Sequence, residues 1–179
     1  HIPWEIRDFR TAGSYSNGNR QDPVTTSIRL TGVSLRFGNS RLGGDYSVYN
    51  LIHPDFNYKI KADLNLADIK DFIAIDTLVE DMSGRVLAEI QMKGDKAILD
   101  NLKKADLLNY DHQADIRMEN TSLKLRNVPF YFRGFTGDVT FTDHLDIINL
   151  TGVFEDSQVS MSGRVDNFLE FLFTRDGNL

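Results

Sequence analysis

Apolar and polar residues alternate strictly along several stretches of the chain, and residues 58–66 show the pattern best. One side of this stretch carries Tyr58, Ile60, Ala62, Leu64 and Leu66, and the other carries Lys59, Lys61, Asp63 and Asn65. Because successive side chains of a β-strand point to opposite faces of the sheet, a period of two predicts a half-buried strand.

The same period of two recurs in five further stretches. Their apolar positions are Val86, Ala88, Ile90 and Met92; Leu123 and Leu125; Val128, Phe130 and Phe132; Val139 and Phe141; and Val159, Met161 and Val165. We therefore expect a sheet with one apolar face and one polar face. Basic residues at alternating positions, Arg29, Arg36, Arg41, Lys59 and Lys61, fit the solvated face.

Short polar breaks separate these stretches and predict the turns of an antiparallel meander. They fall at 38–40, 133–138, 142–144 and 155–157. The alternation slips by one residue around Ile147 and Ile148, which predicts a β-bulge there.

Three stretches have a helical period instead, and each begins after a residue able to cap it. The predicted helices cover 65–73 after Asn65, 95–109 after Asp95, and 167–173 after Asn167. In the first, Asp68 stands three residues after the cap. Residues 11–23, rich in Gly, Ser and Asn, are predicted to form an exposed flexible loop.

Two parts of the chain share the letters "LTGV", at 30–33 and 150–153. In both, further strand-like sequence leads to an Asn-capped helix, so we interpret 30–73 and 150–173 as a degenerate hairpin repeat. Such repetition is typical of sheets that grow by adding units.

Composition predicts one globular, β-rich domain over residues 1–179. The chain is 41% hydrophobic and 26% charged, and its formal net charge of -6 disfavours nucleic acid and anionic membrane surfaces as partners. No apolar run is long enough for a spanning helix. The opening "HIPWEIRDF" lacks Met and a signal-peptide pattern, so we expect an excerpt of a longer protein.

Residue patterns for catalysis are weak. There is no cysteine, and the four histidines, His1, His53, His112 and His144, are dispersed without metal-binding spacing. His53, His112 and His144 are expected in turns, as are the acidic pairs Glu80–Asp81 and Glu155–Asp156. We therefore expect no enzymatic activity, no metal and no cofactor.

The strand motifs resemble those of a known family. "ENTSLKL", "GDVTF", "INLTG", "MSGRV" and "NFLEFL" follow one another from residue 119 to 172, and the upstream "NLIHPDFNYKIKADLNLADIKDFI" fits the same pattern. The chain resembles, over roughly residues 24–173, the C-terminal region of AsmA-like proteins of Gram-negative bacteria, relatives of the TamB group.

That resemblance implies an elongated, curved antiparallel sheet, a half-pipe with two or three short helices and an apolar inner surface. It also implies a periplasmic protein tethered to the inner membrane by an anchor outside this sequence. Its activity would be to shield the acyl chains of phospholipid during transport between the inner and outer membranes, or to support outer-membrane biogenesis, with envelope proteins as possible partners at either end.

The candidate lipid-groove residues are the apolar positions of the alternating stretches. They are Tyr58, Ile60, Ala62, Leu64, Val86, Ala88, Ile90, Met92, Leu123, Leu125, Phe130, Phe132, Val139, Phe141, Val159 and Met161. The same residues could instead fill the core of a β-sandwich, a module that would bind a protein or glycan of the cell envelope through its loops. Alternation alone does not separate the two architectures.

Overall fold

The computed structural model describes residues 6–72, 79–95, 111–126 and 130–166. Nine strands, one α-helix and two short 3-10 helices lie in these ranges. They are β1 Arg7–Ser16, η1 Asn19–Gln21, η2 Pro23–Thr25, β2 Ser27–Phe37, β3 Ser40–Tyr49, β4 Asp55–Asn65, α1 Leu66–Phe72, β5 Val79–Asp95, β6 Asp111–Leu125, β7 Tyr131–Phe141, β8 His144–Phe154 and β9 Ser157–Asp166.

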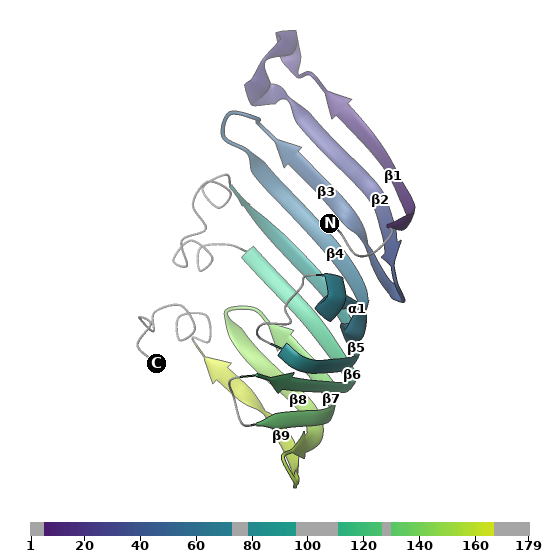
Figure 1. Ribbon diagram of the computed structural model, residues 1–179. Coiled ribbons are helices and arrows are strands. Elements are labelled where there is room, and N and C mark those ends of the chain that lie inside the picture. Colours follow the sequence, from purple (N-terminus) through teal and green to yellow (C-terminus); the bar gives the residue numbers. More distant parts are fainter. Residues whose placement is uncertain (1–5, 73–78, 96–110, 127–129, 167–179) are drawn as a thin grey trace.

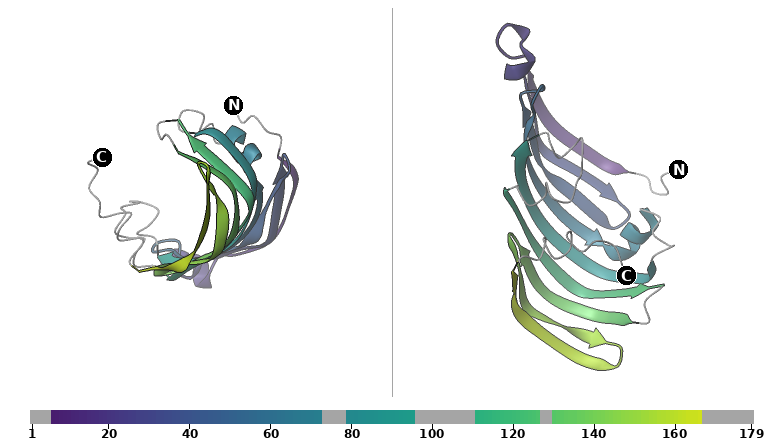
Figure 2. Two further views of the ribbon diagram at one scale, coloured as in Figure 1. Left: turned by 90° about the horizontal axis from the view of Figure 1, so that it is seen from below. Right: turned by 90° about the vertical axis from the view of Figure 1, so that its left-hand side faces the viewer.

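All nine strands form one antiparallel sheet in which each strand pairs with its neighbours in sequence. The sheet is open, with β1 and β9 at its two edges, and it bends into an arc (Figures 1 and 2). The described ranges contain no second sheet, so the β-sandwich alternative is wrong and the elongated, curved sheet is confirmed.

Few of the described residues are fully buried, as expected of a single bent layer. The accessible surface is 12087 Å², whereas a compact monomer of 20.4 kDa would expose about 8,800 Å². The small core contains Val48 and Phe56, with Tyr46, Tyr58 and Met92 packed against them.

Two predicted turns are strands instead. Residues 11–16 belong to β1, so the predicted flexible loop at 11–23 is wrong there, and η1 and η2 occupy most of the remainder. Residues 133–138 continue through β7 without a turn. Both places contain glycine, and 11–16 also contains serine, because strands that bulge or lie at an edge tolerate these residues. The turns predicted at 38–40, 142–144 and 155–157 are found between strands, at 38–39, 142–143 and 155–156, and the third residue of each begins the next strand.

The helix predicted at 65–73 is α1, and its cap is confirmed because the Asn65 side chain accepts a hydrogen bond from the Ala67 amide at 3.0 Å. Asp68 does not extend that cap. Its buried carboxylate accepts hydrogen bonds from the Asn39 amide at 2.6 Å and the Ser40 hydroxyl at 3.0 Å, and thereby fixes α1 to the β2–β3 hairpin. Residues 96–109 and the predicted helix at 167–173 lie outside the described residues; Asp95 ends β5.

Bulges interrupt several strand pairings, and neighbouring side chains bond the amides at these irregularities. The predicted bulge near Ile147 is present, between the Ile147–Gly163 and Leu150–Met161 pairs. Asn149 there has a φ of 49°, and its amide donates to the Ser162 hydroxyl at 3.0 Å. Gly32 donates similarly to Asp45, Asn120 to Thr136, and Gly134 to Ser122.

The two "LTGV" copies therefore lie in equivalent settings but have different backbones. Both are in strands beside a bulge, β2 and β8. In the first copy Gly32 is itself in the irregular segment, with a φ of 58°. In the second, Gly152 has no positive φ and the Phe135 ring covers it, so that an added β-carbon would lie 2.6 Å from that ring. Glycine is thus needed for conformation in one copy and for space in the other.

Candidate functional site: an apolar face inside the arc

The strand register places the apolar side chains of the sheet on one face, because residues directly opposite each other in an antiparallel ladder share a face. One cross-strand row runs from β2 to β9 through Val33, Gly44, Ile60, Ile90, Ala114, Phe141, Leu145 and Val165. A parallel row contains Leu35, Leu42, Ala62, Ala88, Ile116, Val139, Ile147 and Gly163. Both rows cross eight strands without a charged residue.

Shorter rows flank these two on the same face. One contains Leu30, Tyr46, Tyr58, Met92 and His112, and the other begins with Leu64, Val86 and Met118. Toward the far end of the long strands lie Met82, Leu123, Phe132 and Phe154. We call this combined surface the apolar face.

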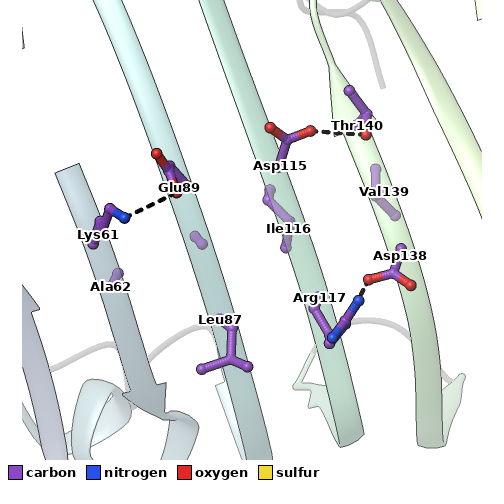
Figure 3. A pocket seen from close by; sticks show the side chains of 11 residues that line it. Lys61, Ala62, Leu87, Glu89, Asp115, Ile116, Arg117, Asp138, Val139 and Thr140 are labelled. Carbon is purple, nitrogen blue, oxygen red and sulfur yellow. Dashed lines mark hydrogen bonds and ion pairs between the residues drawn. The ribbon is translucent and has the colours of Figure 1, made fainter. Parts of the chain in front are cut away.

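Figures 2 and 3 together show which way the apolar face points. The right-hand view of Figure 2 looks into the mouth of the arc, with β1 above, β9 below and β4 running rightward to α1. In that view, β5 lies on the right-hand side of a viewer who follows β4 toward α1. In Figure 3, β5 lies on the left-hand side of the same viewer, so Figure 3 shows the opposite, outer side of the sheet. This outer side carries Lys61, Glu89, Asp115, Arg117 and Asp138. The apolar face is therefore the concave one.

Each predicted groove residue in a strand lies on the apolar face. Leu125 shares the face of Leu123 by alternation in β6, and Val159 and Met161 share the face of Gly163 by alternation in β9. Phe130, which directly precedes β7, joins it through its ring, whose centroid is 5.2 Å from that of Phe154. Leu66, grouped with these residues by period, begins α1 instead. The sequence therefore predicted which residues share a face, even across strands separated by bulges.

Several large side chains of the apolar face are partly exposed to solvent. Ile60, Met161 and Val165 expose 38%, 42% and 41% of their surface, whereas Phe56 exposes 4%. Large apolar residues in a folded core are normally almost fully buried. A contiguous exposed apolar surface of this kind typically marks a binding surface.

A shallow apolar depression of about 190 Å³ lies on this face where Gly44 provides no side chain. Val33, Leu42 and Ile60 line it together with Tyr46 and Tyr58, whose ring centroids are 4.8 Å apart. Burial, with a further contribution from Tyr46, raises the pKa of Tyr58. Tyr58 therefore stays neutral near pH 7 and adds no charge to the face.

His112 lies in β6 and not in a turn as predicted. It is opposite Met92 on the apolar face, its Nε2 is 3.0 Å from the Thr142 carbonyl oxygen, and its ring contacts Phe141. His144, also predicted in a turn, begins β8 and pairs with Asp146 at 3.0 Å. The Asp that precedes each of these histidines suggested a turn, and the prediction was wrong because both histidines stand at the start of a strand.

Charged residues occupy the outer face and pair with one another (Figure 3). Glu89 lies 2.8 Å from Lys59 and 3.4 Å from Lys61, and Arg117 lies 2.7 Å from Asp138. Arg85 donates two hydrogen bonds to Asp63, at 2.7 and 2.8 Å. These pairs join adjacent strands, and their placement confirms Lys59 and Lys61 on the solvated face.

The pairing shifts the ionisation of the outer carboxylates. Hydrogen bonding from Arg85 lowers the pKa of Asp63, bonding from Lys59 lowers that of Glu89, and bonding from Arg164 lowers that of Asp146. Glu80 and Asp81, predicted in a turn, lie in β5 and accept hydrogen bonds from Lys124 and the Tyr131 hydroxyl, at 2.7 and 2.9 Å. These contacts are structural ones between neighbouring strands.

Several apolar-face residues escaped sequence reasoning. Ala114, Ile116 and Met118 alternate with acidic and basic residues in β6, a signal of the same kind as that of β4. Phe135 and Leu150 are among the most buried residues, but the bulges beside them interrupt the period that would have identified them.

No protein-family profile, no curated protein and no solved structure matches this chain. Within the described ranges, no group of three or more His, Asp or Glu side chains could hold a metal ion. No helix in those ranges is long and apolar enough to cross a membrane.

Proposed function

We propose that this chain is a non-enzymatic lipid-binding segment of an AsmA-like envelope protein. It would shield the acyl chains of phospholipid, or of another acyl lipid, during transport between the inner and outer membranes, or in support of outer-membrane biogenesis. By the resemblance of its strand motifs, the segment would lie in the periplasm, tethered to the inner membrane by a part of the protein outside this sequence. Envelope proteins would meet it at either end.

The continuous apolar face is the observation that carries this proposal. Its two long rows cross seven inter-strand gaps, which at about 4.8 Å each gives a length of roughly 34 Å. One leaflet of a bilayer has a hydrocarbon depth of only about 15 Å. An acyl chain would therefore find apolar contacts at many positions along the face, which suits movement better than a closed pocket does.

The energetics favour such a surface. Exposing an acyl chain to water costs about 0.8 kcal/mol per methylene, so two sixteen-carbon chains would cost on the order of 25 kcal/mol. A gap in the apolar surface would expose part of the acyl chain to water. The long rows contain no charged residue between β2 and β9, and their polar counterparts stand on the outer face.

Two variants test the proposal directly. Ile60→Lys and Ile90→Lys each put a charge in the middle of a long row, and we expect at least tenfold weaker binding of a fluorescent long-chain fatty acid. Both side chains are partly exposed, so the lysine ammonium can reach water and the sheet should still fold.

Gln113→Lys is the matched control, because it adds the same charge to the exposed outer side of β6, beside Asp115. It should bind the fatty acid as the unsubstituted chain does. Mass spectrometry of organic extracts from detergent-free protein should also detect bound phospholipid. Lipid-free extracts together with no fatty-acid binding by the unsubstituted chain would refute the proposed function.

A further inference from the structure

The turn between β3 and β4 carries exposed aliphatic side chains, although turns are normally built from polar residues and glycine. Leu51 and Ile52 of this turn, and Val24 of η2, each expose between 40% and 48% of their surface. No aliphatic residue occurs in the described two-residue turns between neighbouring strands, which are 38–39, 142–143 and 155–156. The aliphatic residues here therefore need an explanation other than turn formation.

Backbone hydrogen bonds hold this turn against η2. The Asn50 amide donates to the Thr26 carbonyl oxygen and the Leu51 amide to the Pro23 carbonyl oxygen, both at 2.9 Å. In Figure 1 and in the right-hand view of Figure 2, the segment between β1 and β2 that contains η2 projects beyond the strands at the β1 end of the sheet. The exposed aliphatic residues therefore stand together at one extremity of the described molecule.

Residues 23–26 and 50–53, which we call the aliphatic tip, satisfy their backbone amides internally. Each amide of the tip donates to an oxygen of the tip or of Asp22, which directly precedes it. The donors are Val24, Thr25, Thr26, Asn50, Leu51, Ile52 and His53. An amide that is already bonded can leave water without losing a partner. The aliphatic tip is therefore suited to surroundings that contain little water.

Two exposed tyrosines lie next to the aliphatic tip. Tyr49 ends β3 directly before the turn, and Tyr15 lies near the end of β1 that leads to η1 and η2. The Tyr49 hydroxyl accepts a hydrogen bond from Arg29, and the Tyr15 hydroxyl donates to the Asn17 side chain. Tyrosine concentrates at membrane–water interfaces because its ring is apolar and its hydroxyl is polar. Aliphatic residues at an extremity with tyrosines behind them are suited to the surface of a bilayer.

We propose that the aliphatic tip inserts into the interfacial region of a lipid bilayer. A stable protein interface needs about 800 Å² on each partner, which a few side chains do not supply, whereas a bilayer buries single side chains without a shaped counterpart. Arg20 and Arg29 equal Asp22 and Asp55 in number around the tip, so apolar contact and not attraction to anionic lipid drives the insertion. The tip is separate from the apolar face, and its insertion does not depend on whether that face binds acyl chains.

Flotation of the protein with phosphatidylcholine vesicles tests the proposal. Ile52→Asn removes one aliphatic side chain from the tip and should weaken vesicle binding about tenfold. Ile148→Asn is the matched control, because Ile148 in β8 exposes 46% of its surface and Ile52 exposes 48%. This control should bind the vesicles as the unsubstituted chain does. Added phosphatidylglycerol or salt should change the binding little, since no net charge drives it.

A fluorescent label reports the insertion directly. The chain has no cysteine, so a single introduced cysteine can be labelled specifically. An environment-sensitive fluorophore on Ile52→Cys should shift its emission to shorter wavelength when phosphatidylcholine vesicles are added, whereas the same fluorophore on Ile148→Cys should not. Ile52→Asn should bind the fluorescent fatty acid as the unsubstituted chain does, which separates this test from that of the proposed function.

Vesicle binding that only Ile52→Asn weakens, with an emission shift only at position 52, would support the proposal. No vesicle binding by the unsubstituted chain would overturn it and leave the tip to a protein partner, while intact fatty-acid binding would leave the proposed function standing. Equal effects of Ile52→Asn and Ile148→Asn would also overturn it, because the contact with the bilayer would then lie elsewhere. Binding that requires phosphatidylglycerol would overturn it as well, because charge would then drive the contact.

Discussion

Single polar residues hold the bulges of this sheet in place. A bulged amide leaves the regular ladder and needs another partner. Ser162, Thr136, Ser122 and Asp45 each supply a side-chain oxygen from the neighbouring strand. Ser162 of "MSGRV" and Ser122 of "ENTSLKL" thus have a structural role at a bulge.

Ser162→Ala should lower the free energy of unfolding by about 0.5–1 kcal/mol, because the Asn149 amide would lose its side-chain partner and water would replace it only in part. Urea denaturation measures the change. Ser160→Ala, on the same face of the same strand, should have almost no effect. An equal loss in both variants would mean that the Ser162 contact to the bulge is not responsible.

Gly44→Ala should destabilise the sheet by about 2–3 kcal/mol, because Gly44 has a φ of 153° and an added β-carbon would lie 1.9 Å from the Lys59 carbonyl oxygen. Strands β3 and β4 would have to move apart. At Gly163 a β-carbon meets no atom within 4 Å, so Gly163→Ala should change the unfolding free energy little. Similar urea midpoints for the two variants would contradict the close approach at Gly44.

At the scale of elements, charge pairs between neighbouring strands accompany the apolar rows. Arg85 connects β5 to β4 through Asp63, and Arg164 connects β9 to β8 through Asp146. α1 adds a different kind of connection, since Asp68 holds the β2–β3 hairpin with its buried carboxylate. Each connection joins elements close in sequence, which suits a meander whose described strands form a single layer.

These charge pairs predict the pH dependence of stability. Asp63, Glu89 and Asp146 have folded-state pKa values below their ordinary values of 3.8 and 4.5. The stabilising free energy that these charge pairs contribute is therefore complete at pH values above the ordinary pKa values. It is lost as the pH falls through the lowered pKa values of the folded state. The urea midpoint should change little from pH 7 to 5 and decrease below about pH 4.

Arg85→Gln should make that acid-side decrease smaller, because the pKa of Asp63 would return toward its ordinary value. Arg41→Gln is a weaker perturbation and a useful control, since Arg41 acts on Asp63 only at longer range. If Arg85→Gln and the unsubstituted chain lose stability in parallel between pH 5 and 3, the Asp63–Arg85 pair does not contribute to the pH dependence.

At the scale of the whole molecule, the open arc is what distinguishes this chain from an ordinary β domain. A sandwich built from the same strands would bury Ile60 and Met161, whereas here both remain partly exposed on the concave side. The consequence is a molecule whose apolar face remains partly exposed on the concave side. Function on this reading belongs to a surface made by many strands and to no single residue.

The sequence alone determined most of the strands and the face to which their side chains belong. Alternation is a local property of the backbone, so Tyr58 to Leu64 and Val86 to Met92 could be assigned without knowing their neighbours. The sequence signals for the cap of α1 and for the bulge near Ile147 were also local, so both features were predictable. Residues 11–16 and 133–138 were not, because the glycines of both stretches, like the serines of the first, signal a turn and a bulged or edge strand equally.

Only the tertiary structure decided whether the apolar sides close on one another or remain an open face. One layer and two packed layers require the same alternation within each strand, since both place apolar residues on one side. The choice depends on how strands far apart in sequence are arranged, and on bulges that bend the sheet. The hydrogen bond between Asp68 and Ser40 also depends on the tertiary structure, because these residues are 28 positions apart and meet only once the hairpin and α1 have packed.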